Sequence, residues 1–420
     1  MNDVNKAMAV SHHSHIGGKK LLNVVPMLIL FSLGFVLGMT CNSKFPNLYL
    51  SSKFPNFYLS SAAPSPPPSP PPVPSSSSPP PPVPSSPPPA PLPPQNPDPQ
   101  VGLARFLAPS SVVMHNMTDE ELMWWASMTP KVRSTPYHRA PKVAFLFLAK
   151  GDLPLRPLWE KFFAGHQGLY SIYVHTDPSY TGSPPEDSVF YGRMIPSQKT
   201  IWGDVSLVAA ERRLLANALL DIGNERFVLI SESCIPLYNF TTVYAVVTGT
   251  NTSFVDVMVT PSRYNELFLE RNNITMAQWR KGEEWFEMDR DLALEVVADG
   301  TYFPTFQERC VGLRNCLMDE HYVPTLLSVL RWPRSANRTL TFTDWKRRDG
   351  LYHPHRHGAA EVTPELVEEI RGGARSGGRS RNCSAYHDGA TGVCFLFARK
   401  FTPDTLQPLL RLAPKVMGFG

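Results

Sequence analysis

Little net charge is carried by this chain of 420 residues. It has 40 lysines and arginines against 36 aspartates and glutamates, which leaves a formal charge of +4 at pH 7. The charges are interspersed and form no basic stripe. This composition argues against a nucleic-acid-binding protein, and the 42% of hydrophobic residues suffices for a sizeable core.

Cysteine is also sparse, with 6 residues, and no CxxC or His/Cys cluster has the spacing of zinc ligands. In an oxidising compartment, the close pairs Cys310/Cys316 and Cys383/Cys394 predict disulfides. The run His353–His357 contains three histidines. No carboxylate pattern flanks it and Arg356 lies between two of the histidines, so we interpret it as a loop and expect no metal there.

Only one Asp-x-Asp motif occurs, Asp289-Arg290-Asp291. It lies in Phe286–Ala298, whose periodicity predicts a helix. Alternate residues of a helix point to different sides and cannot readily chelate one ion. We therefore expect a solvated helix face and no metal site.

Proline, by contrast, is abundant: the chain has 44, concentrated between Pro64 and Pro99 in runs with serine. Such a segment cannot bury a core and adopts extended polyproline II, at ~3.1 Å per residue. We predict a stem; a ligand for SH3 or WW domains is the alternative.

An uncharged apolar run spans Leu21–Thr40, long enough to cross a ~30 Å hydrocarbon core. Lys6, Lys19 and Lys20 precede it, so the positive-inside rule keeps the N-terminal tail in the cytosol. A cleaved signal peptide is the alternative, but its apolar region would be shorter. We predict a single-pass type II anchor.

The predicted organisation is a cytosolic tail over residues 1–20, an anchor over 21–40, a stem and linker over 41–140, and a lumenal domain over 141–420. Sequons agree with a lumenal domain, because all of them follow the anchor. Their candidate asparagines are Asn116, Asn239, Asn251, Asn273, Asn337 and Asn382.

From about Pro141 onward, apolar runs of strand length alternate with amphipathic stretches, which predicts an α/β fold with a mostly parallel sheet. The expected strands are Lys142–Ala149, Tyr170–His175, Arg226–Ser231 and Phe254–Val259. The expected helices are Leu155–His166, Ser206–Asp221, capped by Asp204, and Phe286–Ala298. Ligands of such sheets bind at the carboxyl ends of the strands.

Two polar groups are candidates for chemistry. A predicted strand, Val393–Ala398, ends in Arg399-Lys400, and Arg375, Arg379 and Arg381 precede it in a loop rich in glycine and serine. These cations could bind phosphate or form an ordinary basic surface. Glu320, in Asp319-Glu320-His321, could act as a base or merely cap the helix that follows.

Several segments, in this order, resemble the plant branch of the core-2/I-branching β-1,6-N-acetylglucosaminyltransferase family. The resemblance covers about two-thirds of the chain, from Lys142 to the C-terminus. It is carried by Phe145–Leu148, Tyr173–Pro178, Trp202-Gly203, Ser206–Val208, Leu229–Leu237, Arg280–Gly282, Trp285-Phe286, Asp319–Thr325, Asp344-Trp345, His353-Pro354 and Cys394–Phe401.

The resemblance implies a GT-A-like fold and an inverting transfer of a sugar, N-acetylglucosamine by analogy, from a UDP-sugar to a glycan or glycoprotein. No metal or other cofactor is implied. Glu320 corresponds to the general base, and Lys400 neutralises the diphosphate with help from Arg399, Arg379 or Arg381. The nucleotide and donor side would involve Val174, His175, Asp177, Trp202 and Ser206, and the acceptor side Lys281, Trp285, Asp344 and Trp345.

The family also implies a Golgi membrane location. The sequence departs from the plant pattern at Lys346 and at His355–His357, both on the expected acceptor side. Two alternatives remain: a Mn²⁺-dependent transferase of the same fold, and a non-catalytic lumenal or cell-wall scaffold whose working part is the Pro/Ser segment.

Overall fold

The computed structural model describes residues 113–129, 139–311, 313, 316–347, 349–350, 353–373 and 393–420. The predicted tail, anchor and most of the predicted stem and linker lie outside these residues, as do Asn382, Arg379 and Arg381. Among the residues described, no helix is both long and apolar enough to span a bilayer.

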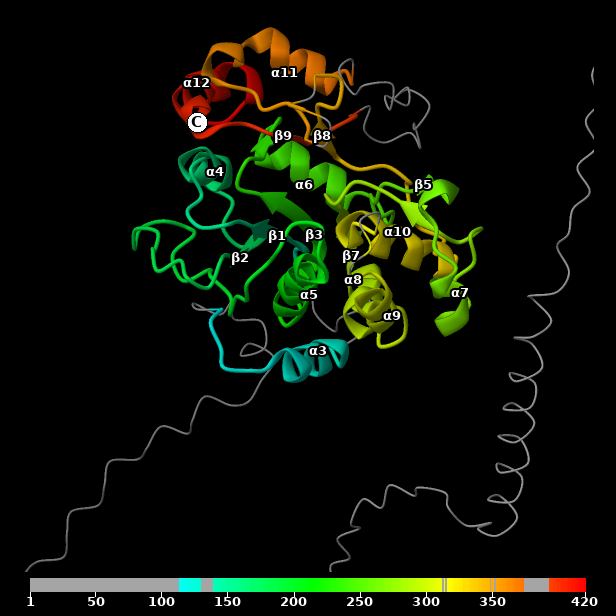
Figure 1. Cartoon of the computed structure of the whole chain (residues 1–420). Helices are drawn as coiled ribbons and strands as arrows, with labels where there is room; N and C mark the ends of the chain where they lie inside the picture. The colour runs from blue at the N-terminus through cyan, green and yellow to red at the C-terminus, as the bar shows by residue number, and fades with distance from the viewer. Residues whose placement is uncertain are drawn as a thin grey trace, which may run out of the picture. The chain divides into compact units, whose positions relative to one another are not determined.

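The main sheet has four strands in the order β2-β1-β3-β7, of which the first three are parallel and β7 is antiparallel to β3 (Figure 1). Its strands are β1 (Lys142–Leu148), β2 (Tyr170–His175), β3 (Asn224–Ser231) and β7 (Glu287–Asp289). A smaller sheet has the order β4-β9-β8, with β4 (Ile235–Pro236), β8 (Thr341–Thr343) and β9 (Phe397–Arg399). A two-stranded ribbon pairs β5 (Met258–Val259) with β6 (Arg280–Lys281).

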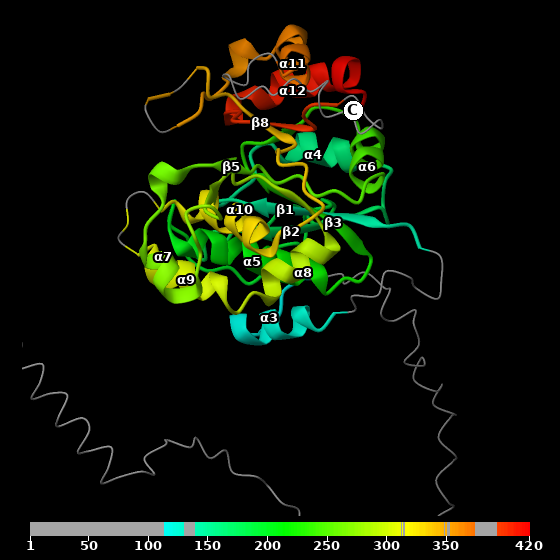
Figure 2. The same cartoon turned by 90° about the vertical axis from the view of Figure 1, so that its right-hand side faces the viewer.

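Helices cover both faces of the main sheet (Figures 1 and 2). The α-helices are α3 (Asp119–Ser127), α4 (Arg156–Phe163), α5 (Val205–Leu219), α6 (Phe240–Thr248), α7 (Leu267–Asn272), α8 (Arg290–Ala298), α9 (Tyr302–Arg309), α10 (Met318–Leu330), α11 (Pro364–Arg371) and α12 (Leu406–Leu412). Short helical turns are η1 (Pro261–Arg263), η2 (Ala359–Glu361), η4 (Pro403–Thr405) and η5 (Ala413–Met417). This is the predicted α/β architecture.

Alternation along β1 gives the sheet two apolar faces and the domain two cores. Ala144, Leu146 and Leu148 pack with α5, α8 and α10. Phe145 and Phe147 point the other way, into an aromatic cluster with Trp159 of α4. Because both faces are buried, the strand appears in the sequence as an unbroken apolar run.

Three predicted elements are confirmed closely: β1, β2 and α5, whose N-cap Asp204 accepts a hydrogen bond from the Ser206 N–H at 2.9 Å. The disulfide Cys310–Cys316 is also present. Cys394 is in a disulfide as well, while its expected partner Cys383 lies outside the described residues.

Three predicted boundaries are wrong. Phe286–Ala298 is not one helix: Glu287–Asp289 form β7, and the helix starts at Arg290. Of the strand expected over Phe254–Val259, only Met258–Val259 is a regular strand. The strand expected at Val393–Ala398 starts later and includes Arg399.

The Asp-x-Asp motif also differs from the expectation. Asp289 is the N-cap of α8 and lies outside its helical turns, so its carboxylate can reach the same partner as that of Asp291. Arg334 Nη2 lies 3.0 Å from Asp289 Oδ2 and 2.7 Å from Asp291 Oδ2. The expectation that Asp289 and Asp291 point to different sides of one helix was therefore wrong. The Arg334 guanidinium lies between the two carboxylates.

A buried ion pair joins β3 to β7. The Arg226 guanidinium donates to both oxygens of Glu287 at 2.5 Å and to the carbonyls of Thr250 and Thr252. Both side chains are almost fully buried. Removing one partner would leave the other charge uncompensated inside the protein.

We expect Glu287→Ala to lower the free energy of unfolding by ~3–5 kcal/mol. The matched control is Glu308→Ala, which removes the partner of Arg271 from an exposed ion pair and should cost less than ~1 kcal/mol. Urea unfolding of both variants measures the difference. Equal midpoints would show that the buried pair has no special role.

Candidate active site

The candidate active site is built at the carboxyl edge of the parallel strands. β2 ends at His175, and β3 ends at Ser231, followed by Glu232. The Asp177 N–H donates to the carbonyl of Lys150, which follows β1, at 3.3 Å. The ends of neighbouring parallel strands therefore bring these polar groups to one edge, where ligands of open α/β sheets bind.

Glu320 lies in the first turn of α10, where a carboxylate could have served as a cap. Its side chain does not cap: Oε2 forms an ion pair with the Lys281 ammonium and lies 3.4 Å from Arg263 Nη1. The Gly282 N–H also donates to the Glu320 carbonyl at 2.8 Å. The sequence left a cap and a functional carboxylate open, and of these the structure shows no side-chain cap at the start of α10.

His321, the next residue, is buried. Its Nδ1 lies 2.7 Å from the Arg280 carbonyl, and its ring stacks on Trp279. Burial lowers its pKa to about 4. His321 therefore fixes the start of α10 against β6 as a neutral ring.

Lys400 follows β9 and is accompanied by Arg399, whose guanidinium lies 4.1 Å from the centre of the Trp285 ring. Burial, and then the charge of Arg399, lower the pKa of the Lys400 ammonium. Two cations held close together in a partly desolvated place favour an anion between or beside them.

Residues 281–285 connect the Glu320 and Lys400 groups. Lys281 pairs with Glu320, and Trp285 packs under Arg399. Between them, Glu284 interacts electrostatically with Asp319, Arg399 and Lys400. Glu320 and Lys400 thus face one region of the molecule.

Antiparallel pairing explains this arrangement. Val228 of β3 is paired with Glu287 of β7, and the Leu229 N–H donates to the Phe286 carbonyl at 3.0 Å. The residues before β7 must then run towards the carboxyl end of β3. This brings Glu284 near Glu232, and both interact with Lys400.

The predicted donor residues occupy different environments. Val174 and His175 are buried at the end of β2, and Asp177 accepts from the Ser179 N–H and hydroxyl. Ser206 Oγ accepts from the Ile201 N–H at 3.0 Å, which fixes the loop before α5. Trp202 on that loop is 60% exposed, with its ring centre 5.7 Å from that of His353.

The predicted acceptor residues divide into two groups. Lys281 and Trp345 are partly exposed, and Trp345 Nε1 donates to Glu283 Oε1 at 2.7 Å. Trp285 (3% exposed) and Asp344 (0%) lie in the interior, so an acceptor could contact them only after other groups move.

Of the described sequon asparagines, Asn116, Asn251, Asn273 and Asn337 are exposed. Asn239 is partly buried and caps α6, with Oδ1 accepting from the Thr242 N–H at 2.9 Å.

Three further carboxyl groups lie near this site, of which the sequence analysis named only Asp319, as the neighbour of Glu320. Glu211 of α5 interacts with Glu284 and Asp319, which lie far from it in the chain. Burial is the largest cause of a raised pKa in all three. Repulsion by Glu284 and Asp319 adds to it at Glu211, repulsion by Asp319 raises the pKa of Glu284 to about 8, and repulsion by Glu320 raises that of Asp319 to about 6. Only a fold that gathers the three could have identified them.

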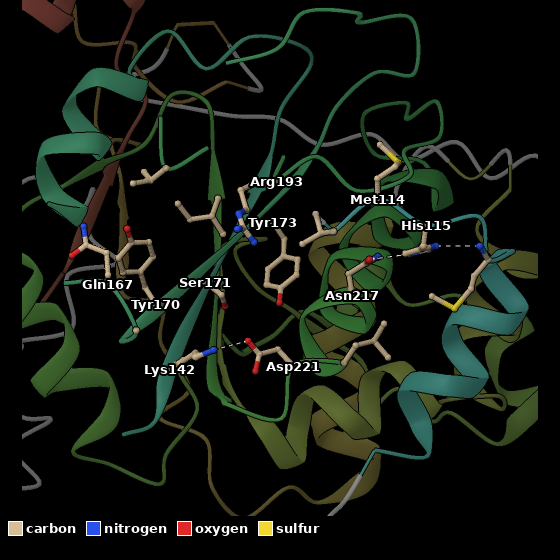
Figure 3. A pocket seen from close by; sticks show the side chains of 16 residues that line it. Met114, His115, Lys142, Gln167, Tyr170, Ser171, Tyr173, Arg193, Asn217 and Asp221 are labelled. Carbon is tan, nitrogen blue, oxygen red and sulfur yellow. Dashed lines mark hydrogen bonds and ion pairs between the residues drawn. The ribbon is translucent and has the colours of Figure 1, made fainter. Parts of the chain in front are cut away.

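A cavity of about 580 Å³ lies elsewhere (Figure 3). It is lined by the first residues of β1 and β2 and the end of α5, with an ion pair between Lys142 and Asp221 at 2.8 Å. These are the amino ends of the strands, so we do not assign the cavity to the donor.

Residues 143–371 match the Core-2/I-Branching enzyme family. The chain belongs to this family. It is also 35% identical, over 310 residues, to glycosyltransferase BC10 of Oryza sativa subsp. japonica, covering 65% of this chain and 76% of that protein. The Core-2/I-branching protein described here is a glycosyltransferase.

The raised pKa of Glu284 makes a prediction for this enzyme. Its carboxyl group has a folded-state pKa of about 8 against a usual 4.5, because of burial and then Asp319. The folded state holds this proton more tightly than the unfolded state, so the stabilisation is complete below about pH 4.5 and is lost as the pH rises through about 8.

We therefore expect the melting temperature to fall less between about pH 5.5 and 8.5 in Glu284→Gln than in the unmodified protein. Glu266→Gln, which removes an exposed carboxylate, is the control and should follow the unmodified protein. Thermal unfolding across this range measures the effect. Parallel curves for all three proteins would contradict the assignment.

Proposed function

We propose that this enzyme transfers N-acetylglucosamine from its UDP-sugar to a hydroxyl of a glycan or glycoprotein, with inversion and without a metal in the reaction. Glu320 takes the proton of the acceptor hydroxyl, whose oxygen attacks the anomeric carbon as the bond to UDP breaks. The observation that carries the proposal is that Lys281 contacts the Glu320 carboxylate while Trp285, on the same short segment, contacts Arg399, the neighbour of Lys400.

Glu320 has the properties that a general base needs. Lys281 and Arg263 both approach Oε2, and two cations favour the ionised carboxylate. Both of these cations donate their hydrogen bonds to Oε2, so Oε1 is the oxygen offered to an acceptor hydroxyl. Lys281, which the sequence places on the acceptor side, would then also orient the Glu320 carboxylate.

Lys400 and Arg399 are suited to the departing diphosphate. Negative charge develops on the leaving oxygen in the transition state, and cations already in place stabilise it without reorganisation. Burial, and then the charge of Arg399, lower the pKa of Lys400, and an arriving diphosphate would favour its charged form. Arg379 and Arg381, which lie outside the described residues, remain candidates to bind the diphosphate together with Lys400.

His175 is a candidate contact for the nucleotide. The Gln198 N–H donates to Nε2 at 3.2 Å, which puts the proton of the neutral ring on Nδ1. Nδ1 is buried and has no hydrogen-bond partner among the described residues, and burial lowers the ring's pKa to about 4. A carbonyl oxygen of the nucleotide's uracil ring would satisfy this donor once the groups that cover His175 move, with Val174 and Asp177 beside it and Trp202 and Ser206 on the sugar side.

The parallel strands with their polar carboxyl edge agree with a GT-A-like fold. We further propose a Golgi membrane protein of type II topology, with residues 21–40 as its anchor, residues 41–140 as its stem and the enzyme in the lumen. The uncharged run at residues 21–40 and the sequons that follow it support this location.

For the full-length chain purified in detergent, UDP release in a screen of UDP-sugars tests the activity. We expect Glu320→Gln to bind UDP as the unmodified protein does and to lose ~10²–10⁴-fold in kcat, because the amide cannot accept the proton. Glu308→Gln on α9 is the control and should keep full turnover. Unchanged turnover in Glu320→Gln would remove this residue from the mechanism.

Lys400→Met should reduce kcat by ~10²-fold or more and weaken UDP binding, since it removes a cation from the leaving group. Turnover of the unmodified protein should need no added Mn²⁺. A rate that rises from near zero with Mn²⁺, and is indifferent to Lys400, would establish the metal-dependent alternative. Absence of both UDP binding and turnover would favour a scaffold.

A further inference from the structure

Side chains on the segment between β8 and α11 form a cluster that the sequence alone did not suggest. His355 and His357 come from the His353–His357 run, and Glu361 ends η2. Nitrogen and carboxylate atoms of these three residues all lie within 4.8 Å of one another. His355 Nε2 is 3.0 Å from each Glu361 oxygen, and the two imidazole centres are 4.9 Å apart.

The loop prediction for this run rested on two points that the structure overturns. Carboxylates are present after all, because the fold brings Glu361 and Asp349 to the histidines. Arg356 does not lie among the donor atoms. Its guanidinium is 3.5 Å from Asp349 and 63% exposed.

An ordinary ion-pair network accounts for His355 but not for His357. The His357 ring is 0% exposed, and both its nitrogens lack a hydrogen-bond partner among the described residues. Asp344 Oδ2 lies 3.9 Å from Nε2, too far for a hydrogen bond. A buried polar group without a hydrogen-bond partner lowers the stability of a protein by ~1–3 kcal/mol. Two such nitrogens on His357 therefore indicate a bound ligand.

We propose that His355, His357 and Glu361 bind one Zn²⁺ ion, with water or Asp344 in the fourth position. Two imidazoles and a carboxylate are a common ligand set for zinc. With metal–ligand bonds of ~2.0–2.1 Å, neighbouring donors of a tetrahedral site lie ~3.3 Å apart, so side-chain adjustments of about 1 Å complete the site.

The surroundings of the cluster resemble those of metal-bound histidines. His355 Nδ1 lies 3.1 Å from Asp349 Oδ1, the carboxylate–histidine contact that orients such ligands. Gly358 N–H donates to Glu361 Oε2 at 3.0 Å and fixes the carboxylate. Arg347, which now lies 2.9 Å from Glu361, has a side chain 41% exposed and can turn into solvent when the ion enters.

The ion would be structural and would not replace Lys400. The His357 N–H donates to the Lys400 carbonyl at 2.8 Å, and the His357 carbonyl accepts from the Thr402 N–H. The metal would thus fasten the segment directly behind the Lys400 backbone to the end of β8. The inference is independent of the proposed sugar transfer.

The first experiment measures the zinc content of the full-length protein purified without chelator. The second measures binding of Co²⁺ to the dialysed protein from the visible absorption of the bound ion. We expect one zinc per chain and the bands of tetrahedral Co²⁺. His355→Ala should abolish both, and Asp349→Asn should weaken Co²⁺ binding by ~10–100-fold. His353→Ala, the control, removes a neighbouring histidine outside the cluster and should leave both unchanged.

Added ZnCl₂ should also raise the melting temperature of the dialysed protein but not that of His355→Ala. A folded wild-type protein that contains no zinc, shows no Co²⁺ bands and melts at the same temperature with and without ZnCl₂ would overturn the proposal. Zinc retained equally by His355→Ala would overturn it too, because the ion would then be bound elsewhere.

Discussion

The pairing of β3 with β7, held by the buried contact of Arg226 with Glu287, is the constraint on which the candidate site depends. Because β7 runs antiparallel to β3, the residues before it are carried towards the carboxyl edge of the sheet. Those residues reach Glu320 at one end and Arg399 at the other. Without this register, no single segment would lie beside both the Glu320 carboxylate and the Arg399-Lys400 pair.

Much of this fold could be predicted because β1, β2 and β3 are apolar on both faces, and α5 begins at an aspartate cap. The wrong boundaries have a common cause: a strand begins and ends where a partner strand pairs with it, and the local sequence does not show that partner. Glu287–Asp289 continue the helical periodicity of α8, and only the partner strand β3 draws them into the sheet. At Val393–Ala398, apolar residues extend beyond the three that find a strand partner, so burial alone overstated the strand.

Less of the candidate site than of the fold could be predicted from the sequence. Glu320 and Lys400 were candidates from their places in the sequence, but the resemblance assigned their joint roles, since neither spacing nor periodicity relates residues 80 positions apart. The ion pair of Glu320 with Lys281 and the gathering of Glu211, Glu284 and Asp319 depend on contacts between distant segments. The carboxylates around His355 were missed for another reason: Asp349 and Glu361 each lie 6 residues from it, outside the His353–His357 run in which ligands were sought.

Asn239 shows how a surface motif can conflict with folding order. Its Oδ1 caps α6, and a side chain added at Gly418 would come within 3.2 Å of its Nδ2, so the C-terminal end of the chain packs over the atom that would carry a glycan. Asn239 leaves the ribosome well before Gly418. A sugar attached at that stage would lie beside the last residues and would compete with their packing around this asparagine.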